Sequence, residues 1–189
     1  MSAKLISPPA KLAVSLTDAK ANLRIPASDT ALDAVIQAWL MGIIEYAEHL
    51  MGRALVSQTW RVSLDAFPDA IKLPRPPVAS VTSVKYYDAD NVLQTLSPAL
   101  YELDNMTEPC RLLAIPGTSW PSTYARRNAV VADIVCGYGD DETNTPPAIK
   151  LYILAKLVEQ FDPSGIPEKD SVQASFIDHL LDRYRIWGL

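Results

Sequence analysis

The first quarter of the chain spaces its apolar side chains by three and four residues, which is typical of amphipathic helices. Ser15 or Thr17 can cap a short helix. A longer helix is predicted to begin at Asp29 or Thr30 and to end at Gly52, a common left-handed terminator. One face of this longer helix is apolar: Leu32, Val35, Ile36, Trp39, Leu40, Ile43, Ala47 and Leu50.

The middle of the chain changes to the two-residue alternation of half-buried strands. Strands are predicted in seven segments: 59–64, 71–73, 80–87, 92–96, 101–103, 111–113 and 129–136. The turn-forming residues from Asp88 to Asn91 predict a hairpin between the third and fourth of these segments. The remainder of 104–128 is interpreted as mostly a long loop, and loops of that length in compact domains usually have a function.

Helical patterns return after the middle region. Residues 148–161 are apolar on nearly all sides, which predicts a helix buried in the centre of the fold. A last helix is expected from Asp170 or Ser171, and its apolar face extends to Tyr184. The order of helices, strands and helices favours the α+β class. The predicted organisation is a single domain over 1–189: N-terminal helices in 1–54, a β-rich insertion in 55–139 and C-terminal helices in 140–189.

Proline and charge refine this picture. Eight of the fifteen prolines lie between Pro68 and Pro121, where they oppose long helices. The net charge of -5 argues against a protein that holds nucleic acid by its phosphates. No secretory signal core is recognisable at the N-terminus, and the most apolar stretch is too short to span a bilayer. A chain in a reducing compartment such as the cytoplasm is therefore expected.

Candidate catalytic chemistry is sparse. A hydrolase could use one of the two histidines, His49 or His179, but no nucleophile elbow accompanies them. The two cysteines, Cys110 and Cys136, are better explained as buried than as nucleophiles or metal ligands. The acidic run from Asp140 to Glu142 favours a solvated loop over a cation site. We therefore expect no catalytic residues, no metal and no cofactor.

Two segments have the composition of interaction surfaces. Large apolar and aromatic side chains alternate with arginine at the C-terminal end: Tyr184, Arg185, Ile186, Trp187 and Leu189. Packing of Trp187 onto the chain's own core is an equally good explanation. The 109–128 loop carries Trp120 and Tyr124, which suit either subunit contacts or a loop folded over the sheet.

Several segments, taken in order, resemble the head–tail connector proteins of tailed phages, also called adaptor or head-completion proteins. The resemblance rests on residues 52–60 (GRALVSQTW), 65–68 (DAFP), 73–77 (LPRPP), 81–86 (VTSVKY), 119–121 (SWP) and 137–140 (GYGD). The opening residues 16–20 (LTDAK) and the closing residues 180–185 (LLDRYR) also fit. These segments are distributed along nearly the whole chain, and the resemblance is weakest in 162–171 and in the residues after Arg185.

This resemblance implies a helical bundle with a β-rich insertion, assembled into a ring that is typically twelve subunits in the virion neck. Such a ring binds the portal protein, neighbouring copies of itself and the next neck or tail protein, while DNA passes through the hole. The C-terminal segment is expected to contact the portal. Acidic side chains lining the hole would repel phosphate, and the candidates are Glu45, Glu48, Asp140, Asp141 and Glu142.

The resemblance leaves the particle and the exact ring open. A prophage or a gene transfer particle is as good a source as a phage. A tail-completion protein of the next ring is an alternative, and a small hydrolase is the alternative from a different class of protein.

Overall fold

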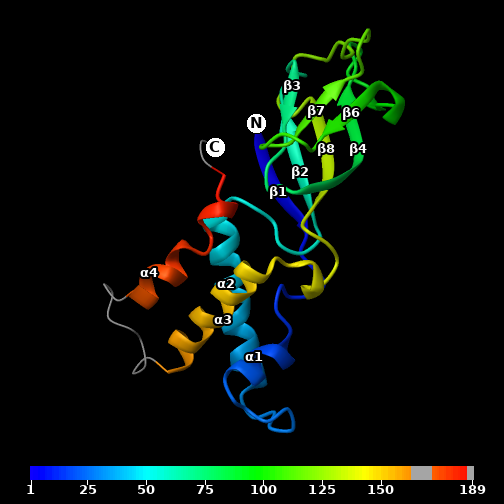
Figure 1. The fold of residues 1–189 in the computed structure, drawn as a ribbon. Coiled ribbons are helices and arrows are strands. Elements are labelled where there is room, and N and C mark those ends of the chain that lie inside the picture. Colours follow the sequence, from blue (N-terminus) through cyan, green and yellow to red (C-terminus); the bar gives the residue numbers. More distant parts are fainter. Residues whose placement is uncertain (163–171, 187–189) are drawn as a thin grey trace. The chain divides into compact units, whose positions relative to one another are not determined.

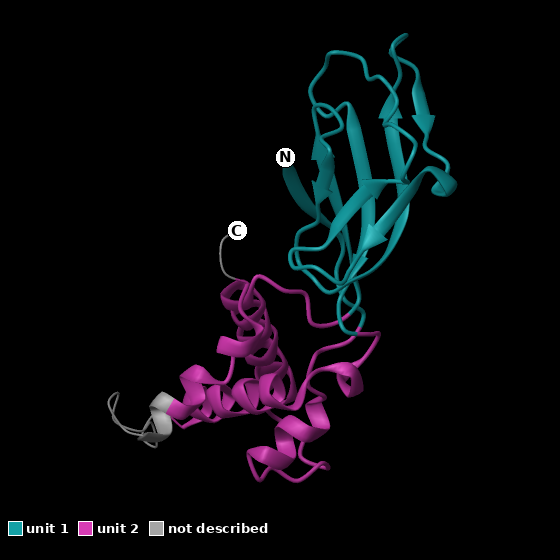
Figure 2. Cartoon of the chain, turned by 45° about the horizontal axis from the view of Figure 1, so that its top comes forward, with its two compact units in different colours: residues 1–10, 57–138 teal, residues 11–56, 139–189 magenta. Residues whose placement is uncertain are grey.

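The structure, a computed structural model, describes residues 1–162 and 172–186 (Figure 1). The chain forms two compact units (Figure 2). The β unit consists of Met1–Ala10 and Ser57–Tyr138, and the helical unit consists of Lys11–Val56 and Gly139–Leu189. Every strand of the described residues lies in the β unit and every α-helix in the helical unit, so the α+β class is confirmed. That the two units act as a single connector domain stays a prediction.

The β unit contains two antiparallel sheets, with strand orders β1-β2-β8-β4-β5 and β3-β7-β6. The strands are β1 (Ser2–Ser7), β2 (Gln58–Leu64), β3 (Ala70–Lys72), β4 (Val78–Tyr87), β5 (Leu93–Thr95), β6 (Tyr101–Asp104), β7 (Arg111–Ala114) and β8 (Val130–Cys136). Each of the seven predicted strand segments overlaps one of the strands β2 to β8, with ends that differ by at most two residues.

The alternation in the sequence determines which face of the larger sheet is buried. Alternate residues of the central strand β8 are buried, and Val62 of β2 and Val84 of β4 pair with its buried Ala132. Ile71 of β3 and Leu112 of β7 are also fully buried. Both sheets therefore contribute to the core of the β unit.

Strand β1 was not predicted, because all six of its residues are exposed and its sequence lacks a clear alternation. It pairs with β2 in antiparallel register, with Lys4 opposite Arg61. Since β1 precedes the helices in the sequence, the β unit is not built from the 55–139 segment alone.

The predicted hairpin is confirmed as β4 and β5, joined by the turn that Asp88 organises. The Asp88 carboxylate accepts hydrogen bonds from the backbone N–H groups of Asp90 and Val92 and from the Gln94 side chain. The Val92 and Gln94 bonds are the main reason that the pKa of Asp88 lies below its ordinary value of 3.8.

Replacement of Asp88 by asparagine tests the role of this charge. Because the pKa is lowered in the folded state, the ionised carboxylate stabilises the fold above pH 3.8, and this contribution is lost as pH falls through the folded pKa. Asp88→Asn is therefore expected to lower the melting temperature at neutral pH, and the gap to the wild type should close in acid. Asp90→Asn, at an exposed position, is the control. A gap that is equal at acid and neutral pH would contradict the prediction.

The helical unit contains α1 (Leu16–Asn22), α2 (Asp33–Met51), α3 (Pro147–Phe161) and α4 (Val172–His179). Ser15 caps α1 as predicted, since its hydroxyl accepts a hydrogen bond from the N–H of Asp18 at 3.0 Å. Gly52 ends α2 in the left-handed conformation with φ 69°, also as predicted. The caps expected at Asp170 and Ser171 lie outside the described residues, and the last α-helix ends at His179 rather than continuing to Tyr184.

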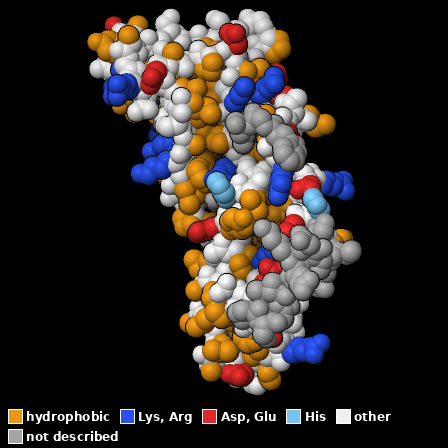
Figure 3. All heavy atoms as spheres, turned by 90° about the vertical axis from the view of Figure 1, so that its left-hand side faces the viewer, with side chains coloured by type: hydrophobic (Ala, Val, Ile, Leu, Met, Phe, Trp, Pro, Cys, Tyr) orange, Lys and Arg blue, Asp and Glu red, His pale blue; other side chains and the backbone are white. Residues whose placement is uncertain are grey.

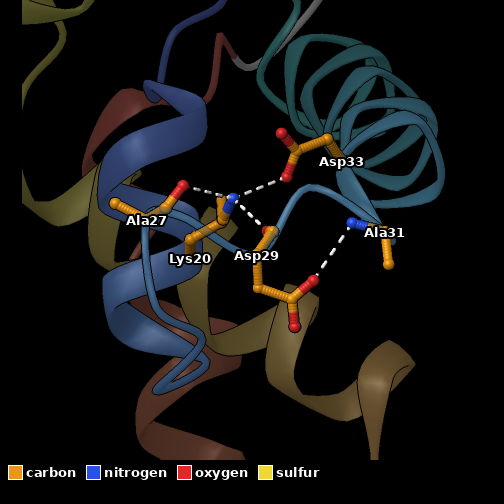
Figure 4. Close-up of polar contacts among 5 residues, drawn as sticks. All are labelled: Lys20, Ala27, Asp29, Ala31 and Asp33. Atoms are coloured by element: carbon orange, nitrogen blue, oxygen red, sulfur yellow. Dashed lines mark hydrogen bonds and ion pairs between the residues drawn. The ribbon is translucent and has the colours of Figure 1, made fainter.

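Helix α2 begins at Asp33, later than predicted, because Lys20 organises the preceding loop (Figure 4). The Lys20 ammonium is buried and donates hydrogen bonds to the carbonyls of Ala27 and Asp29, at 3.2 and 2.5 Å. Its third bond, at 2.7 Å, is to the Asp33 carboxylate in the first turn of α2. The Asp29 side chain accepts a hydrogen bond from the N–H of Ala31. This bond stabilises a turn at Asp29 rather than the start of a helix.

Helices α2 and α3 lie side by side and form the centre of the helical unit (Figure 1). Their buried side chains are Ile36, Leu40, Ile44, Ala47 and Met51 of α2 and Ile149, Tyr152, Ile153 and Leu157 of α3. Trp39 and Phe161 meet edge to face, with ring centroids 6.3 Å apart. The predicted central burial of this helix holds for only one face of α3, since Leu151 and Val158 are 45% and 40% exposed.

Candidate functional site

The described part of the C-terminal segment folds back onto the helical unit. The buried Arg53, just after α2, donates from Nε to the carbonyl of Tyr184, and the N–H of Ile186 donates to the carbonyl of Met51 at 3.1 Å. Tyr184 and Ile186 are half-buried. These two bonds tie the segment as far as Ile186 to the end of α2, and the choice between the two explanations for Trp187 stays open. Trp187 and Leu189 lie outside the described residues.

Arg185 is the predicted partner residue that lies beside a hollow in the surface. Its Nη1 lies 3.2 Å from the Asp182 carboxylate, whose other oxygen is 2.6 Å from Nδ1 of His179. Two neighbouring hollows share Tyr46 and Lys156, and Arg185 lines the second together with Leu50, Tyr152 and Asp178. The sequence contained no signal for these hollows, because their lining residues come from separate helices.

Lys156 is neutralised at these hollows rather than free to attract an anion. Its ammonium lies 3.1 Å from the carboxylates of both Glu159 and Asp178. Burial acts to lower the pKa of Lys156, but the hydrogen bonds and charges of these two carboxylates outweigh it, so the pKa is raised. Lys156 therefore stays protonated at neutral pH and does not act as a general base there.

The two aromatic residues predicted for partner binding in the 109–128 loop have different surroundings. Trp120 is half-buried and stacks on Phe67, with ring centroids 4.7 Å apart and planes at 6°. Tyr124 is 44% exposed, and its backbone N–H donates to the carbonyl of Tyr87. Trp120 therefore contributes to the packing of the β unit itself, while the Tyr124 ring is available at the surface. Partner binding by either residue stays a prediction.

The five acids predicted to line a ring all belong to the helical unit, but two of them have structural roles. Oε1 of Glu48 accepts the N–H of Leu55 at 2.7 Å. Asp141 caps the short 3-10 helix Glu142–Asn144 by accepting from the hydroxyl and N–H of Thr143, and these two bonds are the main reason that its pKa is lowered. Glu45 and Asp140 are exposed, and Glu142 is partly exposed.

Both histidines are exposed, His49 in the last turn of α2 and His179 at the end of α4. Nδ1 of His179 lies 2.6 Å from the Asp182 carboxylate. Cys110 and Cys136 are free and buried, as expected. Among the described residues, no group of histidine, cysteine and carboxylate side chains could hold a metal, and no helix is long and apolar enough to cross a membrane.

Two helices keep apolar residues at the surface of the single chain. The prediction that Leu32 and Val35 belong to a buried helix face is wrong, since they are 42% and 43% exposed. The α2 outer face consists of the exposed residues Ala34, Val35, Ala38, Met41, Gly42 and Glu45. The α3 outer face consists of the exposed or half-buried residues Pro147, Leu151, Leu154, Ala155 and Val158. Figure 3 shows one side of the molecule, on which hydrophobic side chains reach the surface of both units. Exposed apolar patches of this kind are typical of interfaces.

Comparison with solved structures shows which known proteins share this fold. One match is to "Neck of empty GTA particle computed with C6 symmetry", with TM-score 0.83, 21% identity and coverage of 100% of this chain and 97% of that chain. Others, at the same coverage, are to "Virion of native gene transfer agent (GTA) particle" and "Neck of native GTA particle computed with C12 symmetry", with TM-scores 0.81 and 0.74 and identities of 21% and 22%. No family model and no curated protein matches the chain.

The chain therefore has, over its whole length, the fold of a neck component of gene transfer agent particles. This agrees with the resemblance to the head–tail connectors of tailed phages that the sequence segments carry.

Proposed function

We propose that this protein is a structural subunit of the neck of a phage, prophage or gene transfer particle. Copies of it form a ring between the portal and the tail, and DNA passes through the hole. The observation that carries the proposal is the match to a chain of a gene transfer agent neck, which covers 100% of this chain and 97% of that chain with TM-score 0.83. A catalytic role is not part of the proposal.

The symmetry of the matched particles supports a ring. Their necks are described with C6 and C12 symmetry, so the similar chain in each neck is present in copies related by rotation. A heterologous contact repeated by such a rotation closes into a ring. The typical number for a connector is twelve.

The charge of the chain fits a hole through which DNA slides. The net charge is -5, and the exposed Asp140, together with Glu45 and Glu142, places carboxylates on the surface of the helical unit. Carboxylates facing the hole repel phosphate and prevent tight binding to DNA. The carboxylates of Glu48 and Asp141 accept hydrogen bonds within the chain, so these two residues add negative charge but are not free acids facing the hole.

The C-terminal segment supplies the contact with the portal in this proposal. Tyr184 and Ile186 are held against the end of α2 by hydrogen bonds to Arg53 and Met51. Trp187 and Leu189 continue this segment. Tyr124 and the exposed part of the half-buried Trp120 side chain provide further contacts to the next subunit or ring.

Mixing the purified protein with neckless heads tests the proposal. Co-sedimentation with heads that carry a portal is expected, and electron microscopy should show an added annulus below the portal. Heads without a portal are the control and should bind none. Failure to bind portal-bearing heads would contradict the adaptor role. Binding to isolated tail tubes instead would identify the protein as the tail-completion component of the next ring.

A further inference from the structure

We infer that copies of this protein join through unlike helix faces, with the α3 outer face of one copy packed against the α2 outer face of the next. This inference deepens the proposed function and rests on it, since it assigns the surfaces that close the ring. The occupant of each face is a second copy of this chain.

The first observation is that both faces are apolar where solvent would favour polar residues. Val35 and Met41 on α2 are 43% and 48% exposed, close to the values for Leu151 and Val158 on α3. The α3 outer face contains no charged residue between Pro147 and Val158. An apolar helix face of that length is unfavourable in water unless another surface covers it.

The second observation is that the two faces point in different directions. The buried residues of α2 and of α3 meet in the core of the helical unit, and the outer faces lie on the opposite side of each helix. When a chain carries two different apolar faces on different sides, one face of each copy can bind the other face of the next, and the contact repeats from copy to copy. A pair of identical faces would instead give a closed dimer.

The shapes of the two faces are complementary. The α2 outer face is low in the middle, where Ala38 and Gly42 stand, and a Cβ added at Gly42 would meet nothing within 4 Å. The α3 outer face carries the larger side chains of Leu151, Leu154 and Val158. Two helices usually approach closely when large side chains of one pack over small side chains of the other.

The charges beside the faces are also complementary. Glu45 is exposed on the α2 outer face, and Lys150 is partly exposed at the border of the α3 outer face. Neither residue has an ion-pair partner within the described part of the chain. Opposite charges on the two faces favour the unlike pairing and disfavour each like pairing. This assignment places Glu45 at the subunit contact and leaves Asp140 and Glu142 as the accessible acids for the hole.

Cross-linking between single-cysteine variants tests the pairing directly. Ala38→Cys and Leu151→Cys are exposed changes, and a short bismaleimide is added to each variant alone and to an equal mixture. The mixture is expected to give at least about fivefold more covalent dimer than either variant alone. The wild type, whose cysteines are both buried, is the control for background. Equal yields, or no dimer in the mixture, would overturn the assignment.

Charge reversal and steric blocking provide matched variants that preserve the fold. Glu45→Lys or Lys150→Glu should each lower the yield of mixed dimer about fivefold, and the two changes combined should restore it. Gly42→Arg projects a side chain into open space and favours the helix, yet it should block the contact. A ring that forms on portal-bearing heads despite these changes would refute this interface and leave the proposed function standing. If the single-cysteine pair gives no mixed dimer and the wild-type chain forms no ring on portal-bearing heads, both the interface and the proposed function are refuted.

Discussion

Replacing Lys20 with methionine is expected to lower the free energy of unfolding of the helical unit by about 3 kcal/mol. The substitution keeps the aliphatic stem but removes the donor for two backbone carbonyls and leaves the Asp33 carboxylate without its ion-pair partner. Because the Lys20 side chain is only 5% exposed, water cannot fully replace these bonds. The expected loss is thus larger than that of a surface lysine.

Urea denaturation followed by circular dichroism at the helix band measures this effect. All the described α-helices belong to the helical unit, so that signal reports on the unit that contains Lys20. Lys4→Met, at an exposed position on β1, is the matched control and should change stability by less than about 0.5 kcal/mol. Equal midpoints for Lys20→Met and Lys4→Met would show that the loop before α2 does not depend on the ammonium.

Ending the chain after Arg183 is expected to cost the helical unit about 3 kcal/mol, whereas ending it after Ile186 should cost much less. The shorter chain loses the carbonyl of Tyr184 that accepts from the buried Arg53, the backbone bond from Ile186 to Met51 and the Arg185–Asp182 ion pair. The longer chain keeps all three. A guanidinium that stays buried after losing an acceptor is strongly destabilising.

The same two truncations separate folding from partner binding. Thermal unfolding of each purified chain gives the effect on stability, and co-sedimentation with portal-bearing heads gives the effect on binding. A chain that ends after Ile186, keeps its melting temperature and loses the portal would assign binding to the last three residues. Equal melting temperatures for the two truncations would show that the contact between Arg53 and Tyr184 does not stabilise the unit.

Helix and strand positions were largely predictable, because they depend on local patterns. The spacing that buries Ile36, Leu40 and Ala47 is visible in the sequence, and so is the alternation that buries Val130 to Cys136 along β8. Strand β1 was missed for the same reason, since a strand held only by backbone pairing has no hydrophobic signature. The late start of α2 was missed because it depends on Lys20, thirteen residues before Asp33.

The candidate surfaces were less predictable than the fold. Composition favoured the C-terminal residues and Trp120 as contacts, yet Tyr184 and Ile186 are tied to the end of α2, and Trp120 stacks on Phe67. The apolar character of α3 was clear in the sequence, but it was interpreted as burial inside the chain. A helix whose remaining apolar face is covered only by a neighbouring copy has the same composition as one buried within a single core.

The sequence by itself determined the α+β class, the strand segments, two helix ends and the similarity to head–tail connectors, because hydrophobic periodicity and turn chemistry act between residues close in the chain. Only the tertiary structure decided which residues are exposed at the surface. Exposure depends on contacts between residues far apart in sequence, such as the hydrogen bond from Arg53 to Tyr184, and a local sequence pattern does not predict such contacts. The outer faces of α2 and α3 can be identified only once the structure shows which residues of each helix are buried in the core.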